Sequence, residues 1–421
     1  MKRYMFIILL SGLGFDIAHA QSVITLDQCV AWANEAHQFS QHESLIRQSQ
    51  ILALENDSKM YLPRLVLDGT ATYQNENIAI QLPPLPGVEA PNVPLNFNRL
   101  LLNFSQTIYN GRLTAQKKII DSLQYDTKAY QLEVDKSKLK AQITGLYSSI
   151  VLVNEQRQII KRQIATLEAK ARQLQGAVAA GVAYRSDLTT LRAEMLNLQQ
   201  NATEFEYLER SLRQQLSILT TQPIPSTALF ELPNIVLEET GAESRPELRL
   251  INSQQNVLIA QSDLSSASRM PQLGVFGNLG LGYPGYDIFN PSIRPMLLVG
   301  IKLNWQILDW HKAKNDQQLL RWNTDILSYQ YTRVKRQFDA ELIKQRQEIA
   351  KYEELITRDS QIIALRKDVT QDISARLSGG TATATDFIIQ LNNEAVAELN
   401  ESIHVIKLAL AKISYSIIQG K

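Results

Sequence analysis

Two long stretches of this chain contain no proline, and that absence limits its possible folds more than any other feature. The 14 prolines fall in three clusters, at 63–94, 223–246 and 271–295. Proline interrupts the interior of a helix, because it lacks an N–H group and clashes with the preceding turn. The intervals 95–222 and 296–421 can therefore hold helices of unusual length.

Each interval predicts two helices joined by a glycine turn. Apolar residues recur without a strong breaker up to Gly176 and Gly181 in the first interval, and up to Gly379 and Gly380 in the second. A helix of about 68 residues would be roughly 100 Å long. After each turn, apolar residues recur at steps of three and four, which is the pattern of a coiled-coil seam. We therefore expect two antiparallel helical hairpins.

The same sequence pattern occurs twice along the chain. The octapeptide that begins at Gly181 returns at Gly380, with an aspartate in seventh place, Asp187 or Asp386. Segments 107–112 and 306–311 match at the same offset of about 199 residues. A repeated segment order of this kind indicates architecture rather than a catalytic motif.

The repeats predict the following order of elements. The first repeat, 21–243, holds a helix at 26–60, strands at 64–80 and 97–109, a long helix at 111–177, a tip at 178–185, a helix at 186–219 and a further segment at 220–243. The second repeat, 244–421, holds a helix at 245–268, strands at 272–283 and 294–308, a long helix at 310–377, a tip at 378–384 and a helix at 385–418.

The predicted strands alternate between apolar and polar residues, which suits a membrane β-barrel with a wet interior. The residues expected to face lipid are Leu67, Leu102, Phe104, Val275, Val299, Ile301 and Trp305. Those expected to face the lumen are Asp68, Asn103, Lys302 and Asn304. A soluble sheet packed on a core has the same alternation and stays an alternative. Four strands cannot close a membrane barrel alone, because the smallest use about 8, so a barrel requires oligomerisation.

The N-terminus has the organisation of a secretory signal peptide, residues 1–20. Lys2 and Arg3 precede an apolar run, which ends before the small-x-small sequence Ala18-His19-Ala20. The apolar run is too short to span a bilayer, so we expect cleavage rather than a membrane anchor. The single cysteine, Cys29, lies past the cleavage site, so no lipid is expected at the new N-terminus.

The sequence contains no recognisable catalytic, cofactor-binding or metal-binding motif. We find no phosphate loop, no Ser/His/Asp signature and no HExxH, and the histidines lack ligand spacing. The net charge of +1 gives no reason to expect a nucleic-acid partner. We therefore predict neither an enzyme nor a cofactor.

Taken in order, these segments resemble the TolC-type outer-membrane efflux proteins. The resemblance covers essentially the whole chain after the signal peptide. It rests on the opening at 24–33, the segments at 108–112 and 307–311, the Ser-Arg-Pro-Glu-Leu at 244–248, and the two Gly-x5-Asp tips. Each motif is weak alone, but together and duplicated they are specific.

The resemblance implies a homotrimer with a mixed β-barrel and α-barrel architecture. Each protomer would give four transmembrane strands to one barrel in outer-membrane lipid, and its helices to a long periplasmic tunnel. Segment 220–243 would match the mixed equatorial region of the tunnel. The protein would be the passive exit duct of a tripartite efflux or type I secretion system of a Gram-negative bacterium. Its partners would be a periplasmic membrane-fusion adaptor and an inner-membrane transporter of RND, ABC or MFS type.

The resemblance also places the adaptor contact and the tunnel aperture at the two tips. The tip residues so assigned are Gly181, Val182, Asp187, Gly379, Gly380, Thr381 and Asp386. The simpler roles of a helix C-cap for the glycines and a first-turn charge for the aspartates are compatible with it. Some relatives have a second acid and a base where this chain has Ile389 and Ala382. An aperture gated by ion pairs is therefore not expected.

Two other classes of protein share some of these features. A periplasmic coiled-coil adaptor would have a signal peptide and one hairpin flanked by small β-domains, whereas this sequence predicts two hairpins. A soluble structural coiled-coil protein has no use for four amphipathic strands. The duplication and the strands together favour the channel.

Overall fold

The computed structural model describes residues 23–76, 93–233 and 245–420. The predicted signal peptide, residues 77–80 of the first predicted strand and residues 234–243 of the predicted equatorial segment lie outside the described residues. The strand predicted at 64–80 is too long, because it ends at Tyr73 and residues 74–76 are not part of it.

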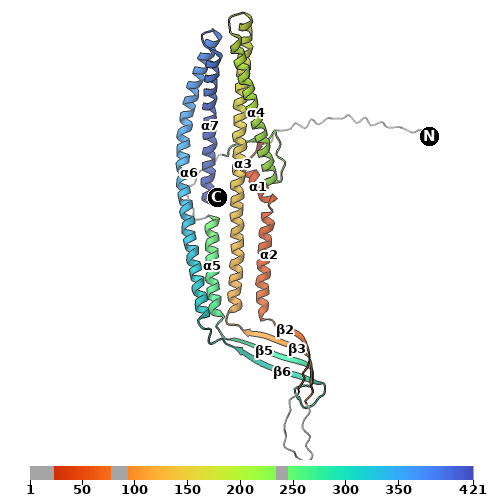
Figure 1. Ribbon diagram of the computed structural model, residues 1–421. Helices are drawn as coiled ribbons and strands as arrows, with labels where there is room; N and C mark the ends of the chain where they lie inside the picture. The colour runs from red at the N-terminus through yellow and green to blue at the C-terminus, as the bar shows by residue number, and fades with distance from the viewer. Residues whose placement is uncertain (1–22, 77–92, 234–244, 421) are drawn as a thin grey trace, which may run out of the picture. The chain divides into compact units, whose positions relative to one another are not determined.

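Both halves of the chain run from helix to two strands, a long helix and a further helix, and the first half has an extra helix and a 3-10 turn before its strands (Figure 1). The first half contains α1 (Leu26–Ala36), α2 (Phe39–Ser58), a 3-10 turn (Lys59–Tyr61), β2 (Arg64–Tyr73), β3 (Asn96–Tyr109), α3 (Leu113–Ala179) and α4 (Arg185–Thr220). The second contains α5 (Pro246–Ala267), β5 (Gln272–Tyr283), β6 (Arg294–Asn304), α6 (Lys312–Ser378) and α7 (Ala384–Ile418). Helices α3 and α6 have 67 residues each, so the proline-free intervals do hold helices of the expected length.

The prediction of one continuous helix at 26–60 is wrong, because the helix is broken between α1 and α2. The capping box of Thr25 and Gln28 starts α1, and His37 ends it. Gln38 then adopts a left-handed conformation with φ of 52°. A residue in that conformation cannot continue a right-handed helix, and no glycine or proline marks the break.

The strand predicted at 294–308 is too long, because β6 ends at Asn304. The last paired residue of its partner strand is Gln272, which follows Pro271. Proline has no N–H group to donate to the ladder, so the pairing stops there. Trp305, assigned above to a strand, therefore lies just outside the sheet and is 55% exposed.

Contacts divide the chain into two compact units, each built from both sequence repeats. The tip unit comprises residues up to 38, 138–239 and 342–417. The strand unit comprises 39–137, 240–341 and the residues from 418 onward.

The strand unit contains an antiparallel four-stranded sheet in the order β2-β3-β5-β6. One row of neighbours across the sheet is Leu67, Leu102, Leu279 and Leu297. Because side chains alternate along a strand, this row fixes which residues share its face. The predicted apolar residues Leu67, Leu102, Phe104, Val275, Val299 and Ile301 all lie on this apolar face, and Asp68, Asn103, Lys302 and Asn304 lie on the opposite, polar face.

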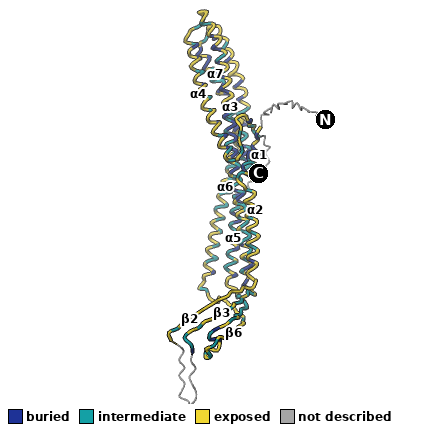
Figure 2. The backbone as a smooth tube through the Cα atoms, turned by 90° about the vertical axis from the view of Figure 1, so that its right-hand side faces the viewer, coloured by how far each residue is buried: buried dark blue, intermediate teal, exposed yellow. Residues whose placement is uncertain are grey.

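In the single chain, the apolar face of the sheet is exposed. Val299 and Ile301 are 74% and 73% exposed, and Figure 2 shows β2 exposed along its length. Within the described residues, β2 and β6 each pair on one side only. The sheet therefore has an uncovered apolar surface and two unpaired edges.

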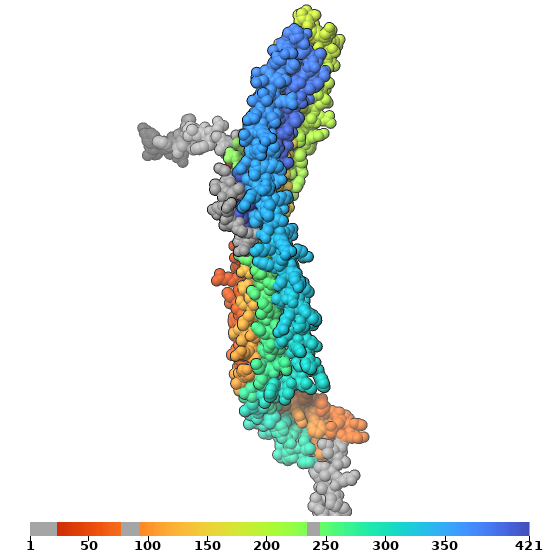
Figure 3. Space-filling model, turned by 90° about the vertical axis from the view of Figure 1, so that its left-hand side faces the viewer, coloured from red at the N-terminus to blue at the C-terminus, as the bar shows by residue number. Residues whose placement is uncertain are grey.

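The tip unit has its own apolar core, built from the ends of α3, α4, α6 and α7. Its most buried members include Leu167, Leu191, Ala384 and Phe387. Figure 3 shows the yellow-green end of the first hairpin in contact with the blue end of the second. The two hairpins thus pack on each other at their tips.

The segment after α4 is tied to α3 by a buried tyrosine. In this segment β4 (Leu229–Phe230) pairs in parallel with β1 (Val23–Ile24). The hydroxyl oxygen of Tyr147 lies 2.8 Å from the Ile24 carbonyl oxygen and accepts the Glu231 N–H at 3.0 Å. Burial raises the pKa of Tyr147 to about 12, so this hydroxyl stays protonated as a hydrogen-bonding anchor.

None of the helices in the described residues has an apolar stretch long enough to cross a membrane.

Two glycines of the sheet provide a matched test of the strand register. A Cβ at Gly280 would overlap the Leu100 carbonyl oxygen and come within 2.8 Å of Leu101 Cα, whereas one at Gly69 would meet only Leu100 Cδ1 at 3.6 Å. We expect Gly280→Ala to lower the free energy of unfolding by about 1–3 kcal/mol, the usual cost of overpacking. Gly69→Ala should have little effect. Urea unfolding of the purified variants measures both, and equal midpoints would contradict the register.

Candidate functional site

The two hairpin tips have the same backbone geometry. In the first, the N–H of Val182 donates to the Ala177 carbonyl at 2.9 Å, and Gly181 has φ of +75°. In the second, the N–H of Thr381 donates to the Arg376 carbonyl at 2.9 Å, and Gly380 has φ of +73°. Each is a Schellman turn, which ends a helix with a left-handed residue.

Conformation rather than space explains the two tip glycines. A Cβ built on Gly181 or Gly380 would meet no atom within 4 Å. A positive φ is nevertheless unfavourable for residues with a side chain. The tip residues Gly181, Val182, Gly379, Gly380 and Thr381 are all exposed, as a contact surface requires.

Asp386 stabilises the start of its own helix. Its carboxylate accepts the Thr383 N–H at 3.0 Å, and its own N–H donates to the Thr383 hydroxyl at 3.2 Å. This is a capping box, which satisfies two N–H groups at a helix start. The hydrogen bonds from Thr383 lower the pKa of Asp386.

Asp187 occupies the matching position in the first tip but has a different partner. Tyr184 stands where the second tip has Thr383, and it makes no side-chain cap bond. The Asp187 carboxylate instead accepts the N–H of Ala384, in the second tip, at 3.2 Å. The two aspartates of the repeat therefore differ: one closes its own helix, and the other joins the tips.

A buried lysine forms a second link between the hairpins. Lys170 in α3 is only 6% exposed. Its Nζ donates to the Ser374 carbonyl at 2.6 Å and to the Ser378 hydroxyl at 2.7 Å, both in α6. Its Nζ also lies 5.5 Å from the ring centre of Phe387. Burial lowers the pKa of Lys170, because these partners are neutral and offset the desolvation of the charge only in part.

A cluster of three charged side chains also links the hairpins, further from the tips than Lys170. Glu398 in α7 lies 2.7 Å from Arg162 in α3 and 3.1 Å from Lys367 in α6. Burial alone would raise the pKa of Glu398, but the hydrogen bonds from Arg162 and Lys367 lower it. Lys170 and Glu398 are not distinguishable in the sequence, since each is one of many charged residues on a long helix. The different role of Asp187 does have a signal in the sequence: Tyr184 stands where the second tip has the capping Thr383.

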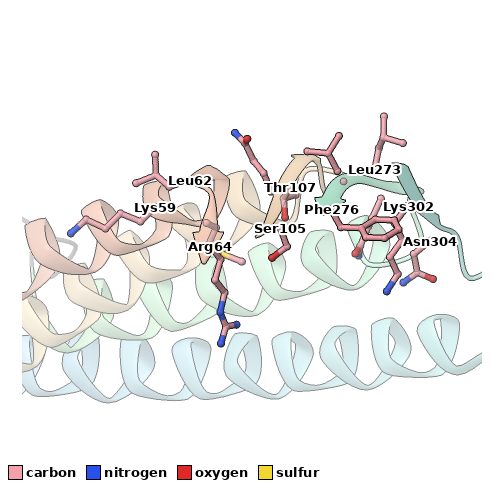
Figure 4. Close-up of a pocket in the computed structure, with 14 residues that line it drawn as sticks. Lys59, Leu62, Arg64, Ser105, Thr107, Leu273, Phe276, Lys302 and Asn304 are labelled. Atoms are coloured by element: carbon pink, nitrogen blue, oxygen red, sulfur yellow. The ribbon is translucent and has the colours of Figure 1, made fainter. Parts of the chain in front are cut away.

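In the strand unit, a cavity of about 510 Å³ lies at the end of the sheet where the helices begin. Figure 4 shows Arg64, Ser105, Lys302 and Asn304 pointing to one side of the sheet, while Leu273 points to the other. The ring of Phe276 lies on Gly300, where an added Cβ would come within 2.7 Å of its Cζ. The cavity is thus on the polar face.

Neither a protein-family model nor a curated protein sequence matches the chain. Solved structures do match it over nearly their whole length. The fold is that of the TolC-type outer-membrane channels, so the resemblance seen in the sequence is confirmed for the fold.

Three of these structures are representative. VceC, an outer membrane protein from Vibrio cholerae, matches with a TM-score of 0.71 and 13% identity, over 94% of this chain and 94% of its own. The outer-membrane channel OprN matches with a TM-score of 0.74 and 14% identity, over 93% and 89%. The MtrE outer membrane channel of Neisseria gonorrhoeae matches with a TM-score of 0.71 and 15% identity, over 94% and 88%.

The different roles of the two aspartates lead to different effects of their removal. We expect Asp386→Ala to speed amide hydrogen exchange mainly at Thr383, whose N–H the Asp386 carboxylate accepts. We expect Asp187→Ala to speed it mainly at Ala384. The lowered pKa of Asp386 means that its stabilisation is present above the ordinary aspartate pKa of about 3.9 and is lost as the pH falls through its lower, folded-state value. After correction for intrinsic rates, exchange at the start of α7 should become faster at low pH in the wild type, and this change should be absent in Asp386→Ala. Identical exchange profiles for the two variants would contradict this assignment.

Proposed function

We propose that this protein is the outer-membrane exit duct of a tripartite efflux or type I secretion system. The observation that carries the proposal is the sheet with an uncovered apolar face and two unpaired edges, continued by two long helical hairpins. The likeness of the fold to outer-membrane channels such as OprN and MtrE supports it. The duct conducts solutes passively and performs no reaction.

The unpaired edges require a closed assembly in a membrane. An open sheet edge in lipid leaves N–H and C=O groups without partners, at several kcal/mol per group. One protomer supplies the four strands of the described sheet, fewer than the 8 or so of the smallest membrane barrels. A homotrimer in which β6 of one protomer pairs with β2 of the next removes every edge.

Within that trimer, the apolar face contacts outer-membrane lipid and the polar face lines the lumen. Leu67, Leu102, Phe104, Val275, Val299 and Ile301 are the lipid-facing residues, with Trp305 next to the sheet. Asp68, Asn103, Lys302 and Asn304 are lumen-facing. The charges of the strands support this orientation, since they all lie on the polar face.

The hairpin tips form the periplasmic aperture and contact a membrane-fusion adaptor. Val182 and Tyr184 are 71% and 78% exposed in the first tip, which gives an adaptor an apolar surface to bind. An inner-membrane transporter of RND, ABC or MFS type completes the system. The protein reaches the outer membrane of a Gram-negative cell through its signal peptide. Two hairpins with a four-stranded sheet do not favour the alternative of an adaptor or a structural coiled coil.

Arginine substitutions on the two faces of the sheet test the function. Wild-type protein should be recovered in the outer-membrane fraction and require detergent for extraction. We expect Val299→Arg to reduce the yield of trimer strongly, because a mid-bilayer arginine costs roughly 2–4 kcal/mol. Asn304→Arg, on the polar face, should assemble normally. Native gels of detergent extracts measure both, and soluble periplasmic wild type or equal yields would contradict the proposal.

A bulky residue at the second tip tests the aperture. We expect Gly380→Trp to leave the trimer intact, because an added Cβ has space there and the strain of a side chain at positive φ is confined to one exposed turn. The bulky side chain should abolish export by filling the opening. Gly380→Asn, which tolerates positive φ, should retain export. Dye accumulation in cells that carry each variant as their only copy measures export, and native gels measure assembly. Export through Gly380→Trp would contradict the aperture, and loss of the trimer would show a structural role only.

A further inference from the structure

Positive charges outnumber negative charges on the polar face of the sheet. The four strands contain five charged residues, and the register places all of them on this face: Arg64, Asp68, Arg99, Arg294 and Lys302. Four are cationic and one is anionic. A face chosen only for solubility would have no reason to favour one sign so strongly.

Most of this positive charge is not neutralised nearby. Arg294 lies 3.9 Å from Asp287 in the loop that precedes β6. Among the described residues, Arg64, Arg99 and Lys302 form no ion pair. Their charge is therefore available to ions in the surrounding water.

Two of the unpaired cations lie at the same end of the sheet, one on each edge strand. Arg64 on β2 and Lys302 on β6 both line the cavity of Figure 4 and point to the same side. The polar groups beside them are neutral, and no carboxylate lines the cavity. Lys59 also lines it but is paired with Glu55 at 2.9 Å.

We propose that Arg64 and Lys302 form a cationic collar that makes the duct selective for anions and gives a weak site for the carboxylate or phosphate groups of its solutes. This inference rests on the proposed function. The two residues lie on the two edge strands, which meet between protomers of the trimer. The collar thus brings Lys302 of one protomer beside Arg64 of the next, and three such pairs surround the lumen. Clefts lined by one sign of charge concentrate counter-ions.

Ion selectivity of the full-length trimer in planar bilayers tests the collar. The reversal potential in a tenfold KCl gradient gives the permeability ratio of chloride to potassium, which should exceed unity in the wild type. We expect Arg64→Gln with Lys302→Gln to lower the ratio by about threefold or more, because such charges set potentials of several kT. Lys302→Gln alone should lower the permeability ratio by a smaller factor. This single variant replaces the double variant if the double variant assembles poorly.

Two controls separate the collar from a general change of the channel. Asp68→Asn removes the one negative charge of the same face and should raise the ratio. In gradients around 1 M salt the differences between variants should fade, because the Debye length falls from about 10 Å at 0.1 M to about 3 Å.

The possible outcomes distinguish the collar from the duct. Current with an unchanged ratio in both glutamine variants, or a wild type selective for potassium, would overturn the collar and leave the duct. Absence of current from the wild type and all variants would overturn the duct and the collar together.

Discussion

The unpaired hydrogen-bonding groups at the two edges of the sheet are the constraint on which the rest of the structure depends. The strands bury little against their own chain, since Leu67 and Val299 are 67% and 74% exposed. A single protomer therefore cannot be the final state of this fold in lipid, where open edges are prohibited. In the proposed trimer, closure would satisfy the edges, cover the apolar face with lipid and create the lumen in one step.

The two sequence repeats share their backbone structure at the tips, and differences in side chains give the tips different contacts. Both tips have the same Schellman turn, with φ of +75° at Gly181 and +73° at Gly380. The replacement of a capping threonine by Tyr184 frees Asp187 to bind Ala384 of the other tip. One change in a repeated motif thus converts a local cap into a link between hairpins.

Sequence patterns predicted the elements well where one local rule decides the structure. The proline-free intervals gave α3 and α6, and period-two alternation gave the faces of the strands. Prediction failed at Gln38, whose left-handed conformation has no glycine or proline to announce it. It failed at the end of β6 because the pairing stops where Pro271 precedes the partner strand β5. The contacts of Lys170 with Ser374 and Ser378, about 200 residues away, depend on how the hairpins pack, which no local pattern encodes.

The polar links between the hairpins would limit how the proposed aperture changes its width. Asp187, Lys170 and Glu398 each join the two hairpins, and their bonds are directional. The apolar contacts of Leu191 and Phe387 beneath them tolerate sliding far better, because dispersion has no preferred direction. Separation of the tips must therefore break the polar links before it uncovers the core. Since Lys170 is buried with neutral partners, its charge would regain water as the tips part. That gain offsets part of the cost of breaking its hydrogen bonds, so the polar links can hold the tips together without making this contact irreversible.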